Sequence, residues 1–226
     1  MTEGGRTYYE ATAAPLQEFP ALEGPHRADV CIIGAGFTGL GAALALAERG
    51  YSVAILEQNR VGSGASGVNG GQIHTGFRRD QIELEKRYGK SDARKLWELG
   101  HAAIADIDAK IKQHTIDAER REGLIYADHR GRFVGDTHRY VDFLRDNYGY
   151  EKAEKLGLDE IRTLIRSDDY EGGMIDRGGG HLHPLKYARG LAKAAAAAGA
   201  EFYEKTKALE IKPGARNKFL CEALML

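Results

Sequence analysis

Three glycines and one acid have the spacing that nucleotide binding requires. Gly34, Gly36 and Gly39 form a Gly-x-Gly-x-x-Gly motif, and Glu57 follows the first glycine by roughly 20 residues. Such glycines permit a tight turn, a close approach of a pyrophosphate to bare backbone, and close packing of a helix on a strand. A carboxylate at that distance accepts hydrogen bonds from both ribose hydroxyls and repels a 2′-phosphate. The pattern therefore predicts a dinucleotide other than NADP.

The elements around this motif are those that must position it. Residues 29–33 and 51–56 are short apolar runs typical of buried parallel strands, and residues 40–47 between them are rich in helix formers. Together they predict one right-handed βαβ unit. The alternative, a glycine-tolerant turn in another α/β fold, leaves the acid at the end of an apolar strand unexplained. The motif alone does not separate FAD from NAD.

A second glycine-rich segment favours FAD over NAD. Residues 61–72 hold five glycines and no charged residue. A flexible linker has a similar composition, but this segment is less repetitive and directly follows the predicted nucleotide-binding unit. An extended flavin needs backbone without side chains along its ribityl chain and ring. Ser66 and Asn69 are suited to hydrogen bonds with phosphate or flavin atoms.

Three stretches together resemble the D-amino-acid-oxidase-like flavoproteins. They are residues 29–57, the Gly-Ala-Ser-Gly-Val-Asn-Gly-Gly-Gln stretch at 64–72, and Gly-Gly-His-Leu-His-Pro-Leu at 179–185. The likeness extends from about residue 8 to residue 213. It implies an α/β fold: a Rossmann-like FAD-binding domain of the GR2/DAO type, with an incomplete α+β substrate domain inserted into it.

The resemblance also sets the expected domain limits. An N-terminal arm covers residues 1–28, the discontinuous FAD-binding domain covers 29–80 and 178–214, and a partial substrate or cap domain covers 81–177. Family members continue beyond this point, whereas residues 215–226 lack strand alternation and are expected to be an atypical tail of a truncated chain.

The same resemblance implies a set of FAD contacts. The pyrophosphate would be held by Gly34, Ala35, Gly36, Phe37, Thr38 and Gly39, the adenosine ribose by Glu57, the path to the isoalloxazine by Ala65, Ser66, Asn69, Gly70 and Gln72, and the adenine by the backbone of Ala208. Neither a catalytic residue nor a metal site is assigned.

The expected activity follows from the resemblance. It implies an enzyme that uses FAD, bound covalently or not, to oxidise the C–N bond of an amine to an imine, which water hydrolyses. Oxygen or another acceptor would take the electrons, and a gamma-glutamylated polyamine is the leading substrate. Two alternatives remain: a non-catalytic FAD-binding fragment or subunit, and an NAD-linked dehydrogenase.

Composition narrows the possible partners and location. The 226 residues carry a formal net charge of -1, which gives no electrostatic reason to expect nucleic acid or an anionic membrane surface. The apolar run at 37–47 is shorter than the roughly 20 residues of a membrane span. Two cysteines and the absence of a signal-like segment favour the reducing cytoplasm.

Periodicity predicts the remaining elements. Helices are expected over residues 80–118, 136–148 and 159–165, and from Pro184 to just before Gly199. The apolar stripe of the first consists of Leu96, Leu99, Ala103, Ile104, Ile107 and Ile111. The helices over 136–148 and 159–165 are each expected to be capped by their first Asp. Short strands are expected at 123–127, 173–176, 202–203 and 208–211. Trp97 is expected to pack in the core.

Overall fold

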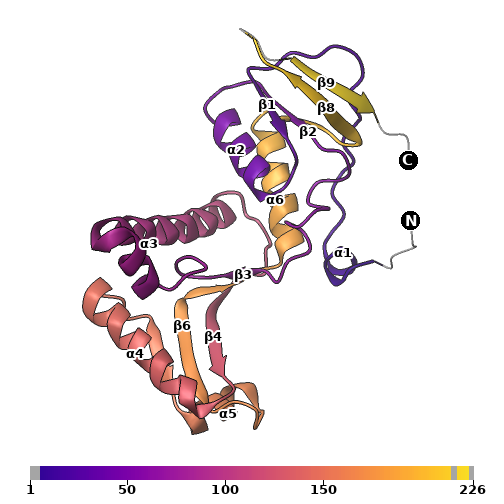
Figure 1. The fold of residues 1–226 in the computed structure, drawn as a ribbon. Coiled ribbons are helices and arrows are strands. Elements are labelled where there is room, and N and C mark those ends of the chain that lie inside the picture. The colour runs from indigo at the N-terminus through magenta and orange to yellow at the C-terminus, as the bar shows by residue number, and fades with distance from the viewer. Residues whose placement is uncertain (1–5, 215–217, 224–226) are drawn as a thin grey trace. The chain divides into compact units, whose positions relative to one another are not determined.

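The computed structural model describes residues 6–214 and 218–223 (Figure 1). The chain divides into two compact units. Unit 1 comprises Met1–Gly70, Lys110–Glu119 and His183–Leu226, and unit 2 comprises Gly71–Ala109 and Arg120–Leu182. Within the described part of the chain, no helix is both long and apolar enough to cross a membrane.

Unit 1 is built on a parallel sheet. Its strands are β1 (Val30–Ile33), β2 (Val53–Leu56) and β7 (Glu201–Tyr203), in the order β1-β2-β7. Helix α2 (Phe37–Ala47) joins β1 to β2 and lies beside helix α6 (Pro184–Ala197) (Figure 1). The expected βαβ unit is therefore present. All four residues of β2 are buried, as a central strand of a parallel sheet requires.

Helix α6 begins and ends as its sequence predicts. Pro184 is the first helical residue, where its missing N–H costs nothing, and His183 caps the helix by accepting a hydrogen bond from the Lys186 amide at 3.2 Å. Gly199 follows the C-cap with a φ of 99°, a conformation that glycine adopts without strain.

The N-terminal arm contains a short capped helix and contacts residues in and just after β7. A short helix, α1 (Tyr8–Thr12), forms in it and is closed by a capping box between Thr7 and Glu10. Further along, the Phe19 amide donates to a carboxylate oxygen of Glu204 at 3.3 Å. The Phe19 ring also stacks on Phe202 of β7 at 4.7 Å between centroids. The arm is thus part of unit 1.

The expectation that the tail lacks a strand was wrong for its central part. Residues Lys218–Ala223 form strand β9, which pairs antiparallel with β8 (Thr206–Lys212). A two-stranded hairpin satisfies its backbone hydrogen bonds without strict apolar–polar alternation, which is why the pattern did not reveal it. Residues 215–217 and 224–226 of the tail lie outside the described residues.

Unit 2 is built on an antiparallel sheet with a long central strand, β6 (Gly172–His181). Strand β4 (Arg121–Asp128) pairs with one side of β6, and β5 (Ala153–Leu156) and β3 (Gln72–Ile73) pair with the other. Both β3 and β5 were missed by the sequence analysis. Because β3 pairs with the end of β6, residues 71–80 and 178–182 group with unit 2 rather than with unit 1.

Three helices accompany this sheet: α3 (Gln81–Gln113), α4 (Gly131–Tyr148) and α5 (Leu158–Ile165). Helix α3 kinks at Gly89, which has a φ of 80°, and its last residues, from Lys110, group with unit 1. A buried cluster of unit 2 consists of Trp97, Val141, Leu144, Tyr150, Ala153 and Met174. Trp97 is therefore a core residue, as expected.

Two local expectations for these helices were wrong. Leu99 and Ala103, both assigned to the apolar stripe of α3, are exposed, Leu99 at 60%. The helix instead buries Ala93 and Trp97. The helix caps are Arg130 and Gly157, not the two aspartates, because α4 and α5 each start earlier in the chain.

Candidate functional site

The turn between β1 and α2 requires glycine at Gly34 and at Gly39, for different reasons. Gly34 has a φ of 94°, and a side chain there would enter open space. At Gly39 the opposite holds, because a Cβ would collide with the Gly34 carbonyl and lie 3.2 Å from the Ile32 side chain. One glycine thus provides the turn and leaves bare backbone, and the other lets α2 pack directly on β1.

The second glycine-rich segment lies against this turn. The hydroxyl of Ser66 accepts a hydrogen bond from the Phe37 amide at 3.0 Å, and a Cβ at Gly36 would lie 2.8 Å from that hydroxyl. Ser66 therefore satisfies the first free amide of α2. In an α-helix the next amides, here those of Thr38 and Gly39, also lack carbonyl partners within the helix and carry the positive end of its dipole.

Glu57 is held at the end of β2 by backbone donors. Its Oε2 accepts from the Ala35 amide at 2.8 Å, and its Oε1 accepts from the Asn59 amide at 2.8 Å. The main chain of Glu57 is fixed as well, because its amide donates to the Tyr203 carbonyl at 2.9 Å. A carboxylate has about four acceptor positions, so two remain for ligand hydroxyls.

The loop that carries Ser66 has its own anchors. The Gly62 amide donates to the Ala35 carbonyl at 3.1 Å, which ties the loop to the glycine turn. The Asn69 side-chain amide donates to the carbonyls of Ala65 and Ser66, each at 3.0 Å. A Cβ at Gly70 would meet nothing within 4 Å, so its backbone faces open space.

Two expected contacts belong to other strands. Gln72 belongs to β3 of unit 2, where it pairs with His181 and its Oε1 is 3.3 Å from Nε2 of His74. Ala208 lies in β8 of unit 1, opposite Cys221 of β9. The remaining expected residues, Gly34–Gly39, Glu57, Ala65, Ser66, Asn69 and Gly70, all belong to unit 1.

The arrangement fits the pyrophosphate and ribose of a dinucleotide such as FAD. It offers a helix N-terminus for the phosphates, a positioned carboxylate for the ribose, and backbone that no side chain covers. Among residues 6–214 and 218–223, no group of three or more His, Cys, Asp and Glu side chains is arranged to hold a metal ion.

A buried anchor of this site was missed by the sequence analysis. Glu204 is 1% exposed; its Oε1 accepts from the Val61 amide at 2.8 Å, and its Oε2 lies 3.1 Å from Nε of Arg60. It therefore holds the start of the glycine-rich loop as well as the N-terminal arm. No motif marks this residue, because its partners are far away in the sequence.

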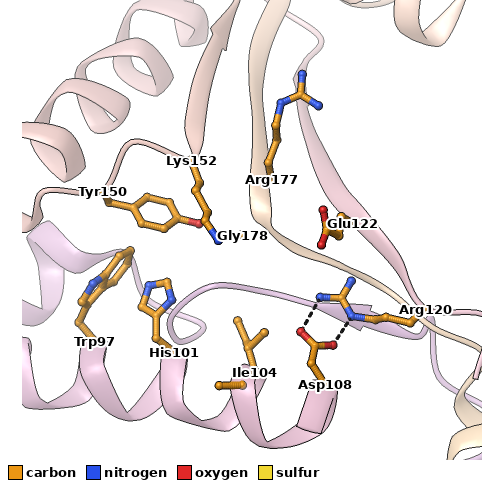
Figure 2. Close-up of a pocket in the computed structure, with 11 residues that line it drawn as sticks. Trp97, His101, Ile104, Asp108, Arg120, Glu122, Tyr150, Lys152, Arg177 and Gly178 are labelled. Carbon is orange, nitrogen blue, oxygen red and sulfur yellow. Dashed lines mark hydrogen bonds and ion pairs between the residues drawn. The ribbon is translucent and has the colours of Figure 1, made fainter. Parts of the chain in front are cut away.

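Unit 2 contains a pocket of about 450 Å³ that the sequence also did not reveal (Figure 2). Trp97, His101 and Ile104 of α3 line one side, and an ion pair between Asp108 and Arg120, at 2.9 Å, lies at its edge. The Nε2 atom of His101 is buried without a hydrogen-bond partner in the described part of the chain, and burial lowers the pKa of this histidine.

A buried carboxylate lies beside this pocket. Asp176 is 2% exposed and accepts hydrogen bonds from the hydroxyls of Tyr150 and Thr75 and from the Gly178 amide, the last at 2.9 Å. Burial, reinforced by the neighbouring Asp176, raises the pKa of the Tyr150 phenol. Because its acceptor positions are largely taken, Asp176 holds the fold of unit 2 rather than presenting itself to a ligand.

Comparison with known proteins agrees with the geometry of unit 1. The chain is 38% identical over 208 residues to the probable oxidoreductase OrdL of Rhizobium meliloti, covering 92% of this chain and 49% of that protein. It is 37% identical over 218 residues to the gamma-glutamylputrescine oxidoreductase of Escherichia coli, covering 94% and 50% respectively. The chain thus spans about half the length of these relatives.

Comparison with solved structures and with a family model points to the same class of protein. The crystal structure of glycine oxidase from Geobacillus kaustophilus matches with a TM-score of 0.75 at 26% identity, over 87% of this chain and 52% of that one. The family model described as FAD dependent oxidoreductase, DAO, matches residues 29–222. The chain therefore belongs to the DAO family of FAD-dependent oxidoreductases.

Proposed function

We propose that this chain binds FAD at the β1–α2 turn and contributes to the oxidation of a C–N bond in an amine. The single observation that carries the proposal is the position of Glu57. Its carboxylate is held 2.8 Å from the Ala35 amide, inside the glycine motif, so the acid and the motif form one site. Family membership favours FAD over the NAD alternative.

In this proposal the chain's residues bind and orient the cofactor. The amides of Thr38 and Gly39 hold the pyrophosphate, Glu57 holds the ribose, and the Ser66 hydroxyl keeps the Phe37 amide fixed. The backbone at Gly70 borders the path toward the flavin ring, and Gln72 and the backbone of Ala208 complete the expected contacts. When bound, FAD supplies the capacity to accept two electrons from the C–N bond.

One relative supports a proposal for the substrate class. We infer a gamma-glutamylated amine, because one relative is a gamma-glutamylputrescine oxidoreductase at 37% identity. The imine product would be hydrolysed by water, and oxygen or another acceptor would take up the electrons. Both cysteines are free thiols, which suits a reducing compartment such as the cytoplasm.

A second candidate is an FAD-binding subunit that is inactive alone. The half-length match favours it, because this chain corresponds to only about half of each relative. The test is to load the purified chain with FAD and add gamma-glutamylputrescine without oxygen. Catalysis by this chain is supported if the flavin absorption band at about 450 nm is lost and the aldehyde from hydrolysis of the imine is formed.

Each other outcome of this experiment has a defined meaning. FAD binding without loss of the flavin band supports the inactive subunit and contradicts independent catalysis. Failure to bind FAD contradicts both candidates. Putrescine without the glutamyl group serves as the matched substrate control, and a faster reaction with it would contradict the proposed substrate class.

A further inference from the structure

The pocket of unit 2 contains one free cation and one free anion (Figure 2). Lys152 and Glu122 both line it, and within residues 6–214 and 218–223 neither of them makes an ion pair. The other two cations of the wall are neutralised: Arg120 pairs with Asp108 at 2.9 Å, and Arg177 pairs with a glutamate of β5 at 2.5 Å. A molecule that enters the pocket therefore meets one unpaired charge of each sign.

The two free charges lie on opposite sides of strand β6. Glu122 belongs to β4, where it is opposite Gly180. Lys152 directly precedes β5 on the other side of β6, and its carbonyl accepts a hydrogen bond from the Arg177 amide at 2.9 Å. Neighbouring strands are about 4.8 Å apart, so about 10 Å separates the two backbones across the sheet. A ligand with its two charges at opposite ends fits this spacing better than one that carries both on one carbon.

Strand β6 presents bare backbone between these charges. Residues 178–180 are three consecutive glycines, and Gly178 lines the pocket. A Cβ at Gly178 would collide with the Tyr150 hydroxyl and would lie 3.3 Å from the Cδ atom of Lys152. The glycine therefore allows the aliphatic part of Lys152 to lie close to the strand, and it leaves this part of the pocket without a side chain from β6.

The remaining wall of the pocket is mostly apolar and aromatic. Trp97 and Ile104 of α3 and Tyr150 are all buried and all line it. The His101 ring is in contact with both aromatic rings, with its centroid 4.4 Å from that of Trp97 and 5.2 Å from that of Tyr150. Buried polar atoms nearly always have a hydrogen-bond partner, so the unpaired Nε2 of His101 in the described structure marks this wall as incomplete without a bound group.

We propose that this pocket binds a small zwitterion with an apolar body, whose anionic group meets Lys152 and whose cationic group meets Glu122. The pocket volume of about 450 Å³ lies within the range of small-molecule sites, roughly 300–1,000 Å³. The apolar body packs on Trp97 and Ile104, which removes their pocket-facing surface from water. This inference goes beyond the proposed function, because every lining residue belongs to unit 2 and none of the expected FAD contacts is among them.

The test is isothermal titration calorimetry of the purified 226-residue chain, with and without FAD, using para-(aminomethyl)benzoate as the zwitterion. Its ammonium and carboxylate groups stand at opposite ends of a benzene ring, and we expect it to bind at a single site. Para-methylbenzoate lacks the ammonium group and para-methylbenzylamine lacks the carboxylate. Each should bind at least about 10-fold more weakly, because one charge-assisted interaction is lost. This comparison leaves the protein unchanged, so it is independent of any effect on folding.

Variants assign each charge to its side chain. Lys152→Met should abolish the advantage of the zwitterion over para-methylbenzylamine, and Glu122→Gln should abolish its advantage over para-methylbenzoate. Lys86→Met and Glu98→Gln change exposed residues of α3 that do not line the pocket, and they should leave all three affinities unchanged. Ala105→Phe adds a ring at an exposed position of the lining and should weaken binding of the zwitterion by at least about 10-fold.

Three results would overturn the proposal. They are the absence of zwitterion binding, equal affinity for the two singly charged compounds, and unchanged affinity of an Ala105→Phe variant whose far-ultraviolet circular dichroism matches that of the parent. Displacement of the zwitterion by FAD would place it in the cofactor site and would also contradict the proposal. Because binding is measured with and without FAD, a failure here is distinguishable from a failure of the proposed cofactor site.

Discussion

Glu57 of unit 1 and Asp176 of unit 2 are both carboxylates held by backbone amides, but their surroundings give them different roles. Glu57 is partly exposed and accepts two backbone hydrogen bonds, which leaves acceptor positions open. Asp176 is buried and accepts from two hydroxyls and an amide. Solvent access and unused acceptor positions, rather than residue type, distinguish a ligand-binding acid from a structural one.

The largest expected effect comes from the close approach of Gly39 to the Gly34 carbonyl within the glycine turn of unit 1. Gly39→Ala should destabilise the protein by about 3 kcal/mol and abolish FAD binding, because the new Cβ collides with the Gly34 carbonyl. Urea unfolding and FAD titration measure the two effects.

Gly41→Ala is the matched control in the same helix. A Cβ at Gly41 meets nothing within 4 Å, so this change should stabilise the protein by about 0.5–1 kcal/mol. Equal stability and equal FAD affinity of the two variants would show that the close approach at Gly39 affects neither property.

Asp176→Asn should lower stability by about 2 kcal/mol, because one charged acceptor of the Tyr150 and Thr75 hydroxyls is replaced by a donor. FAD affinity should stay within about twofold of the parent, since the residue belongs to unit 2. The unfolding midpoint in urea reports the first effect. A large loss of FAD affinity with unchanged stability would reverse the roles assigned to the two acids.

Ser66→Ala should lower the free energy of unfolding by about 1 kcal/mol, because the Phe37 amide at the start of α2 loses its acceptor. The midpoint of thermal unfolding measures this loss of stability. Ser63→Ala in the same loop is the control, since the Arg60 amide lies 3.4 Å from its hydroxyl and that bond is weak. A greater loss at Ser63 than at Ser66 would contradict the described contact.

The smallest effect is a pH dependence at His183. Burial lowers its pKa below the ordinary value of 6.5, with Lys186 and Arg189 lowering it further and Glu119 opposing them. The unfolded state therefore binds the proton more readily, so stability is complete above pH 6.5 and declines as the pH falls below it. Protonation removes the acceptor for the Lys186 amide.

Unfolding midpoints measured between about pH 5 and 8 test this sign. His183→Asn retains a helix cap and should flatten the dependence, leaving the part of the same sign that the lowered pKa of His101 contributes. His129→Asn, at an exposed position, should behave like the parent. Higher stability of the parent at acidic pH would contradict the account.

The sequence alone predicted the parts of the fold that depend on residues close together in the chain. The β1–α2–β2 unit, the N-terminal Pro184 of α6 and the glycine motif are local patterns, and each appears in the structure. The parallel pairing of β1 with β2 follows from the same local pattern.

The sequence did not predict contacts between residues that are far apart in the chain. The bonds of Asp176 to Thr75 and of Glu204 to Phe19 join segments more than a hundred residues apart. No periodicity marks such contacts. The exposed Leu99 shows the same limit, because a helix with several apolar faces does not reveal from its sequence which one will be buried.

The most direct test of the central claim is the equilibrium dissociation constant of FAD for the purified chain and for its Glu57→Gln variant, with Glu23→Gln as an exposed control. The variant should bind FAD about 10–100-fold more weakly, because a charged acceptor is replaced by an amide that presents N–H groups to the Ala35 or Asn59 amide. Equal affinity of parent and variant, or no FAD binding by the parent, would contradict the assignment of Glu57 to the cofactor site.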